Sequence, residues 1–107
     1  MARRQEQVAE LLKHEAAAFF NDVTPTNCLV TVTNTKVSSD YQYATIYITV
    51  FPDERTDEIV ALGQKKIYEL KEYMKSHTEL GRIPWLSVEL DRGEKHRQRI
   101  EEVSRDL

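Results

Sequence analysis

Hydrophobic and polar residues alternate with a period of two between Cys28 and Phe51, which is typical of two half-buried β-strands. One face of this pair is apolar and consists of Cys28, Val30, Val32, Ala44, Ile46, Ile48 and Val50. The opposite face consists of threonines and tyrosines: Thr31, Thr33, Thr35, Tyr43, Thr45, Tyr47 and Thr49. Because Ser38, Ser39 and Asp40 are turn-forming residues, the sequence predicts an antiparallel hairpin with a short connection.

Apolar residues on either side of the hairpin recur at three- and four-residue intervals, which indicates amphipathic helices. The first helix is predicted over about residues 4–20, with Val8 and Phe19 on its apolar stripe. The second is predicted over about residues 57–76, and its stripe includes Gly63. A glycine inside a helix costs about 1 kcal/mol relative to alanine. Two explanations are open: a close approach of the helix to the sheet, or a bend in the helix.

A third strand is predicted over residues 83–91, with Leu86 and Val88 on its apolar face. Trp85 falls on the more polar face of this strand. Packing against the covering chain is the favoured explanation for it, ahead of a surface anchor for a partner. A turn and a short helix over residues 94–107 complete the pattern.

The predicted order is therefore helix, strand, strand, helix, strand, helix. The second and third strands are joined through a helix long enough for a crossover, and one sheet face is apolar. These features predict an α+β sandwich of two layers, with a three-stranded sheet covered by helices on one face. No repeat or linker divides the chain, so we expect a single domain over residues 1–107. The expected core packs Val30, Val32, Ile46, Ile48, Leu86 and Val88 against Leu12, Phe19, Ile67 and Leu70.

Composition narrows the class of protein. The 107 residues are 40% hydrophobic and 31% charged, with a net charge of −3. No apolar run approaches the roughly 20 residues that span a bilayer, and the N-terminal segment lacks the apolar core of a secretory signal. The single Cys28 allows no intrachain disulfide and is expected to be a buried structural thiol. We therefore expect a cytoplasmic protein with no membrane partner.

The residue types that perform catalysis or bind metals do not form a motif. His14, His77 and His96 are far apart in the sequence and accompany no pair of cysteines. The three glycines do not cluster into a phosphate-binding loop. We expect no enzyme activity, no metal, no cofactor and no small-molecule substrate.

Positive charge is concentrated locally in spite of the negative total. The second helix carries Lys65, Lys66, Lys71 and Lys75 away from its apolar stripe, and Arg82 follows it. Exposed cations at helical spacing suit the phosphates of a nucleic acid. Three glutamates share the region, however, so its five basic residues leave a net charge of only +2. Charge alone leaves an RNA-binding face and a solvated helix with ion pairs equally open.

Several motifs occur together along the chain. The hairpin combines a threonine- and valine-rich strand at 29–33, a Ser-x-Asp-aromatic turn at 38–41 and the segment Ala-Thr-Ile-Tyr-Ile at 44–48. The first helix begins with two arginines, and an Arg-Ile-Pro-x-Leu segment at 82–86 leads into the third strand. This combination resembles the bacterial ribosome-binding factor A family over nearly the whole chain.

The resemblance implies a type II KH-like fold, whose element order matches the order derived above. It implies a non-enzymatic, monomeric assembly factor that binds the small ribosomal subunit and its 16S ribosomal RNA. It also implies a role in late maturation of that subunit, including rRNA processing, and in adaptation to cold.

One motif of this family is displaced in the chain. The family has an Ala-x-Gly kink in the helix before the third strand, and the equivalent window here holds Lys66-Ile67-Tyr68. The only Ala-x-Gly, Ala61-Leu62-Gly63, lies some five residues earlier. Either the kink has moved or the helix is straighter in this chain.

The hypothesis for RNA contact rests on exposed cations around the second helix and its neighbours, which would bind phosphates and RNA shape. These candidate residues are Arg3, Arg4, Lys65, Lys66, Lys71, Lys75 and Arg82. The alternative is a KH-like protein-interaction module without a direct RNA function, in which Trp85, Tyr41 and Tyr43 form the hot spot.

Overall fold

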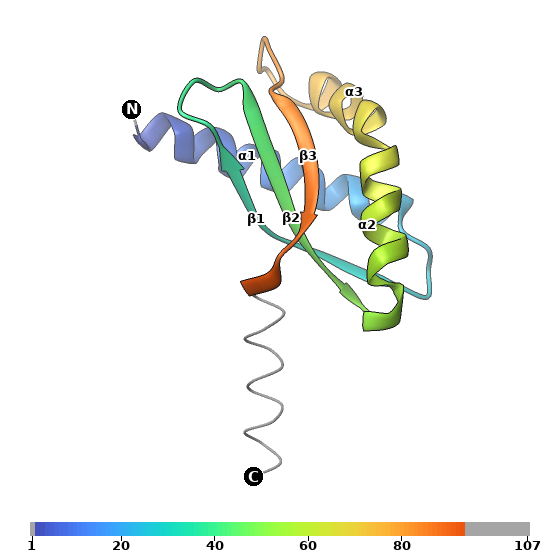
Figure 1. Cartoon of the computed structure of the whole chain (residues 1–107). Helices are drawn as coiled ribbons and strands as arrows, with labels where there is room; N and C mark the ends of the chain where they lie inside the picture. The colour runs from blue at the N-terminus through green and yellow to red at the C-terminus, as the bar shows by residue number, and fades with distance from the viewer. Residues whose placement is uncertain (1, 94–107) are drawn as a thin grey trace.

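The computed structural model describes residues 2–93 and contains three helices, a short 3-10 turn and three strands in that part of the chain (Figure 1). In chain order the elements are α1 (Ala2–Val23), β1 (Leu29–Val37), β2 (Tyr43–Phe51), η1 (Asp53–Arg55), α2 (Thr56–Lys65), α3 (Ile67–His77) and β3 (Trp85–Leu90). The predicted helix at 94–107 lies outside the described residues.

The strands form one sheet in the order β1-β2-β3, with β1 antiparallel and β3 parallel to β2. The helices all lie on one face: α1 crosses behind the sheet, and α2 and α3 follow the side of β3 (Figure 1). This confirms the predicted two-layer α+β sandwich and its crossover connection. The order of the described elements is that of the type II KH-like fold, with the second helix divided into α2 and α3.

The core lies between the sheet and the helix layer, as predicted. Its fully buried side chains come from every layer and include Leu12, Phe20, Ile46, Ile48, Ile59, Leu70, Met74 and Val88. Two of the predicted members, Val30 and Ile67, are only half-buried at the margin of the core. Cys28 is also half-buried, so the expectation of a buried thiol is wrong.

A β-bulge in β1 changes which residues face the core. The register with β2 shifts between Val32 and Asn34. Because one extra residue reverses the alternation of a strand, Thr35 and Val37 turn into the core. The prediction that Thr35 shares the polar face is therefore wrong. At the bulge, the Thr33 hydroxyl donates a hydrogen bond to the carboxylate of Asp91 just after β3, at 2.5 Å.

The predicted helix over residues 57–76 is broken at Lys66. Its backbone (φ −97°, ψ 15°) departs from helical values, and its N–H is shared between the carbonyl oxygens of Leu62 (3.0 Å) and Gly63 (3.2 Å). Of the two explanations for Gly63, the close approach to the sheet is confirmed, whereas the break lies three residues later, at Lys66. A Cβ on Gly63 would lie 3.0 Å from Val88 Cγ1 and 3.1 Å from the Phe20 ring. The break falls within the window 66–68, so both expectations are wrong: the helix is not straighter, and the kink has not moved to Ala61-Leu62-Gly63.

The hairpin turn confirms the chemistry expected of its polar residues. The Ser38 hydroxyl donates to Asp40 Oδ1 (2.6 Å), and the same oxygen accepts the backbone N–H of Gln42 (3.1 Å). Tyr41 adopts the left-handed region at φ 60° to complete the turn. The Ser38 hydroxyl, followed by the Gln42 N–H, lowers the pKa of Asp40 below its ordinary value.

We predict that Gly63→Val destabilises the protein by about 1–3 kcal/mol, because Phe20 and Val88 are buried and have little room to move. The matched control is Ala61→Val, two residues away on the exposed side of α2. Since it changes only helix propensity, it should cost about 0.7 kcal/mol or less. Urea unfolding measures both variants, and equal costs would contradict the close packing of Gly63.

We predict that Ser38→Ala raises the pKa of Asp40 toward its ordinary value of 3.8. The lowered pKa means that this carboxylate contributes stability above its unfolded-state pKa and loses it as pH falls through the folded-state value. The pH window of the effect therefore lies below about pH 4. Carboxyl NMR titration measures the shift, with the exposed neighbour Ser39→Ala as the control that leaves the pKa unchanged.

Candidate nucleic-acid interface

Two of the candidate arginines lie together at the end of the sheet where β2 and β3 begin. Arg4 projects from the first turns of α1, and Arg82 lies in the connection before β3; both are exposed. They line one shallow cleft of about 320 Å³ together with Tyr41 and Pro84. Arg3 belongs to the first turn of α1. Arg4 and Arg82 are far apart in the sequence, and the fold brings them to one cleft.

The candidate lysines lie along α2 and α3, where two of them form ion pairs. Lys66 Nζ lies 3.3 Å from Glu69, and Lys75 Nζ lies 3.9 Å from Glu72. Exposed pairs of this kind are worth about 0–1 kcal/mol, so a phosphate can replace the glutamate at small cost. Lys65 and Lys75 are exposed, whereas Lys66 and Lys71 are half-buried, so the expectation that these lysines are all exposed is wrong for two of them.

Lys71 has a different partner, the indole of Trp85. Its ammonium nitrogen lies 5.3 Å from the ring centroid, which is within the range of a cation–π contact. This contact joins α3 to the first residue of β3. Sequence reasoning selected both residues, but it assigned them to competing hypotheses and did not place them together.

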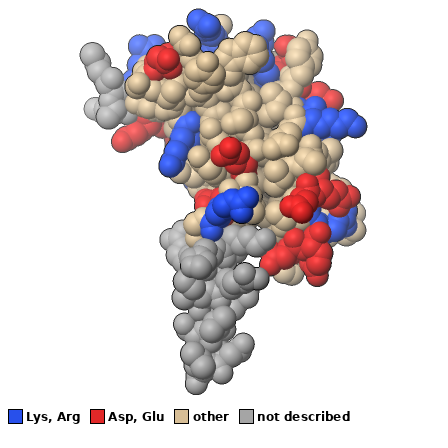
Figure 2. All heavy atoms as spheres, in the orientation of Figure 1, with Lys and Arg blue, Asp and Glu red and all other residues tan. Residues whose placement is uncertain are grey.

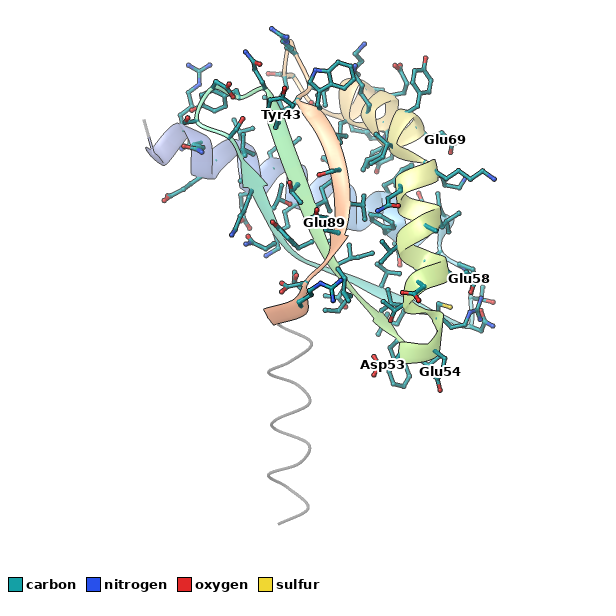
Figure 3. The ribbon with its side chains drawn as sticks, in the orientation of Figure 1. Tyr43, Asp53, Glu54, Glu58, Glu69 and Glu89 are labelled. Atoms are coloured by element: carbon teal, nitrogen blue, oxygen red, sulfur yellow. The ribbon has the colours of Figure 1, made fainter. Side chains whose placement is uncertain are left out.

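Trp85 is 69% exposed, so the favoured expectation that it packs against the covering chain is wrong. The helices pack on the other face of the sheet, and Trp85 lies on the open face with the Lys71 side chain of α3 reaching its ring. Tyr43, its partner in the β2–β3 register, is 60% exposed on the same face. Figure 3 shows Tyr43 at the end of the sheet where β2 begins. Tyr41, the third aromatic of the alternative hypothesis, is half-buried.

Acidic residues gather at the opposite end of the molecule, around η1 and the start of α2. Asp53, Glu54, Asp57 and Glu58 are all exposed there. Arg55 hydrogen-bonds to Glu58, which lowers the pKa of Glu58 and raises that of Arg55. In Figure 2 several red side chains collect at the lower right, and blue side chains lie along the top with some red ones among them. The charge of this acidic protein is therefore unevenly distributed, with its densest acidic cluster around η1.

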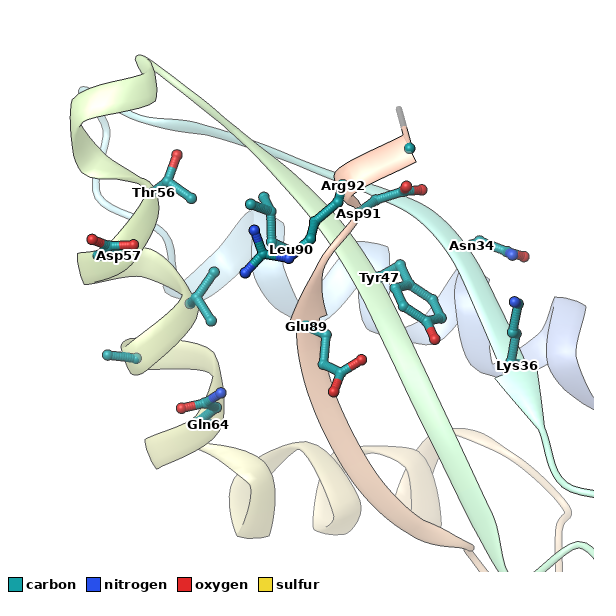
Figure 4. A pocket seen from close by; sticks show the side chains of 13 residues that line it. Asn34, Lys36, Tyr47, Thr56, Asp57, Gln64, Glu89, Leu90, Asp91 and Arg92 are labelled. Carbon is teal, nitrogen blue, oxygen red and sulfur yellow. The ribbon is translucent and has the colours of Figure 1, made fainter. Parts of the chain in front are cut away.

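A further hollow lies across β3 and the adjoining part of α2 (Figure 4). Its volume is about 610 Å³, and its charged lining mixes Lys36 and Arg92 with Asp57, Glu89 and Asp91. Lys36 also lies over the Tyr47 ring at 5.7 Å. Within residues 2–93, no three histidine, cysteine or carboxylate side chains are grouped to hold a metal ion. In the same part of the chain, no helix is both long and apolar enough to cross a membrane.

Comparison with known proteins gives a consistent result. The family model described as ribosome-binding factor A matches residues 4–104. Ribosome-binding factor A of Chlorobium chlorochromatii is 32% identical over 106 residues, which cover 96% of this chain and 86% of that protein. The Desulforamulus reducens protein of the same name is 31% identical over 110 residues, covering 100% of this chain and 92% of its own length.

Solved structures show the same fold. The crystal structure of ribosome-binding factor A from Thermus thermophilus matches with a TM-score of 0.72 and 18% identity, covering 82% of this chain and 97% of that chain. A homology model of the Thermus thermophilus factor, fitted into a cryo-EM map of its complex with 30S, matches with a TM-score of 0.67 and 18% identity over 77% of this chain and 89% of that chain.

We predict that the fluorescence of Trp85, the only tryptophan in the chain, reports a solvent-exposed indole. Its native emission maximum should lie close to that of the unfolded protein, and acrylamide should quench it almost as efficiently in both states. A blue-shifted, protected emission in the native protein would show instead that the indole is packed.

Proposed function

The chain belongs to the ribosome-binding factor A family, and from that premise we propose that it binds the small ribosomal subunit and its 16S ribosomal RNA as an assembly factor. A Thermus thermophilus member of this family has been placed in a complex with 30S, which supports the choice of partner. The proposed role is late maturation of the subunit, including rRNA processing, by a single non-enzymatic domain in the cytoplasm.

The observation that carries this proposal is the uneven distribution of charge. Exposed or half-buried cations lie along α2, α3 and the neighbouring loops with glutamates among them, whereas four exposed acids cluster around η1 and the start of α2. A local positive field attracts phosphates even when the total charge is negative. We propose that the basic end of the molecule contacts rRNA through Arg3, Arg4, Lys65, Lys66, Lys71, Lys75 and Arg82. These contacts recognise phosphates and RNA shape.

A second candidate function is favoured by the exposed aromatics Tyr43 and Trp85. Large exposed aromatic side chains are frequent hot spots of protein interfaces. In this alternative the chain binds a protein partner and has no direct RNA function. Ionic strength separates the two candidates, because RNA binding falls steeply with salt whereas an aromatic protein interface responds little.

The proposed function is tested by cosedimentation of the purified protein with isolated ribosomal subunits. Binding to small subunits, immature particles included, is expected at low salt, with none to large subunits. Absence of binding to any small-subunit form would overturn the proposal and make the protein-interaction function the leading candidate.

We predict that charge reversal of the lysines weakens binding to the small subunit. Lys65→Glu, Lys66→Glu and Lys71→Glu should each weaken it several-fold, and the triple variant about tenfold or more, because each removes a phosphate contact and adds repulsion. Thermal stability should change little, since surface substitutions usually stay within about 0.5 kcal/mol.

Arg55→Glu is the matched control for the single reversals. It changes the net charge by the same amount, but Arg55 lies in the acidic cluster at the other end of the molecule. Its binding should stay near that of the unaltered protein. Equal losses in the control and the lysine variants would attribute the effect to total charge and contradict a localised RNA-binding surface.

A further inference from the structure

We propose that Tyr43 and Trp85 form a stacking platform for unpaired bases of RNA on the open face of the sheet. This inference rests on the proposed function and adds a second kind of contact to it, since the lysines and arginines bind phosphates only. The platform is a pair of exposed aromatic side chains at the first residues of β2 and β3, next to the basic end of the molecule.

The backbone presents the two rings side by side. Tyr43 and Trp85 are register partners in the parallel pairing of β2 with β3, so their side chains leave the same face of neighbouring strands. Such strands lie about 4.8 Å apart. The Trp85 N–H donates a hydrogen bond to the Gln42 carbonyl oxygen at 2.8 Å, which fixes the start of β3 against β2. Both rings therefore stand on paired strand backbone, which fixes the positions of their Cα atoms before a ligand arrives.

Burial shows that the platform is open to a ligand. Tyr43 and Trp85 remain 60% and 69% exposed, although both are large aromatic residues. The described helices pack on the opposite face of the sheet, and the contact recorded between them and this pair of rings is the Lys71 side chain of α3 over Trp85. Aromatic faces that project from a sheet bind bases by stacking, and this interaction tolerates different sequences because every base has a π-face.

Charge favours RNA over a protein as the occupant. Lys71 lies 5.3 Å from the centre of the Trp85 ring, and Arg82 precedes Trp85 by three residues. Arg4 shares a cleft with Arg82 on the same end of the molecule. A base stacked on the platform would have its own phosphates within reach of these cations. The combination of aromatic faces and adjacent cations is typical of surfaces that bind single-stranded nucleic acid.

The residues that follow Tyr43 and Trp85 on the same face of the sheet limit the platform to the start of β2 and β3. Thr45 and Ser87 follow the aromatic pair in the register, and the Ser87 hydroxyl donates to Thr45 Oγ1 at 3.2 Å. Glu89 follows on β3, and Figure 3 shows it near the middle of the sheet. Because a carboxylate repels phosphates, the platform accommodates one or two nucleotides at the start of β3 and does not extend along the whole face.

The unique tryptophan provides a direct test. Base stacking quenches indole fluorescence, so a short single-stranded oligoribonucleotide should quench Trp85 in a saturable manner. An oligomer of equal length that lacks bases carries the same phosphates and should cause little quenching. Equal responses to the two oligomers would overturn base stacking.

Leucine variants test the role of the aromatic rings in binding, because leucine is apolar but has no ring on which a base can stack. Trp85→Leu and Tyr43→Leu should each weaken oligoribonucleotide affinity about fivefold or more, measured by polarisation of a labelled oligomer. Tyr43→Phe retains the ring and should bind like the unaltered protein. Phe51→Leu is the matched control, because Phe51 is 71% exposed at the far end of β2 beside the acidic cluster.

Parallel cosedimentation with small subunits separates the platform from the proposed function. If the unaltered protein binds subunits and the two leucine variants bind them equally well, the platform is wrong and the function stands. If the unaltered protein binds no subunits, the function itself fails. If the leucine variants lose subunit binding while the oligomers give no base-dependent quenching, the rings contact a protein and the RNA platform is overturned.

Discussion

The close packing of α2 on the sheet at Gly63 positions the helix residues proposed to contact RNA. Since Gly63 has no side chain, Phe20 from α1 and Val88 from β3 both reach the helix backbone, and three elements meet at one point. The helix then breaks at Lys66, and α3 continues toward the start of β3 (Figure 1). This path brings Lys71 over Trp85. A glycine and a helix break thus connect the core to the basic end of the molecule.

The same architecture separates two kinds of surface. All described helices pack on one face of the sheet, which leaves the threonines, tyrosines and Trp85 on the other face in contact with solvent. The acidic residues at η1 lie at the opposite end from Arg4 and Arg82. In the proposed function, RNA would be attracted to the basic end and repelled by the acidic cluster, and this asymmetry would orient the protein before contact. The proposed phosphate contacts and base stacking would then act on neighbouring surfaces.

Local patterns in the sequence were sufficient to predict the fold. Contacts between segments that are distant in the sequence could not be predicted from those patterns. The alternation in β2 and the stripe of α1 predicted their buried faces correctly, because each depends on its own residues. The bulge near Thr33 was not predictable, since a single added residue leaves no composition signal. The exposure of Trp85 depends on which face the helices cover. For the proposed interface, the sequence supplied candidate cations, but only the fold shows that Arg4 and Arg82 line one cleft and that Lys71 lies over Trp85.

The central claim is that the basic end of an acidic protein binds small-subunit RNA, and the most direct test is the affinity for small ribosomal subunits across a salt series. The account predicts a linear decrease of log K with log salt, with roughly a tenfold or larger loss between 50 and 200 mM. Lys65→Glu should flatten that slope by about one unit, as expected for the loss of one phosphate contact. Affinity that is unchanged across the series, with the same slope in the variant, would contradict the claim.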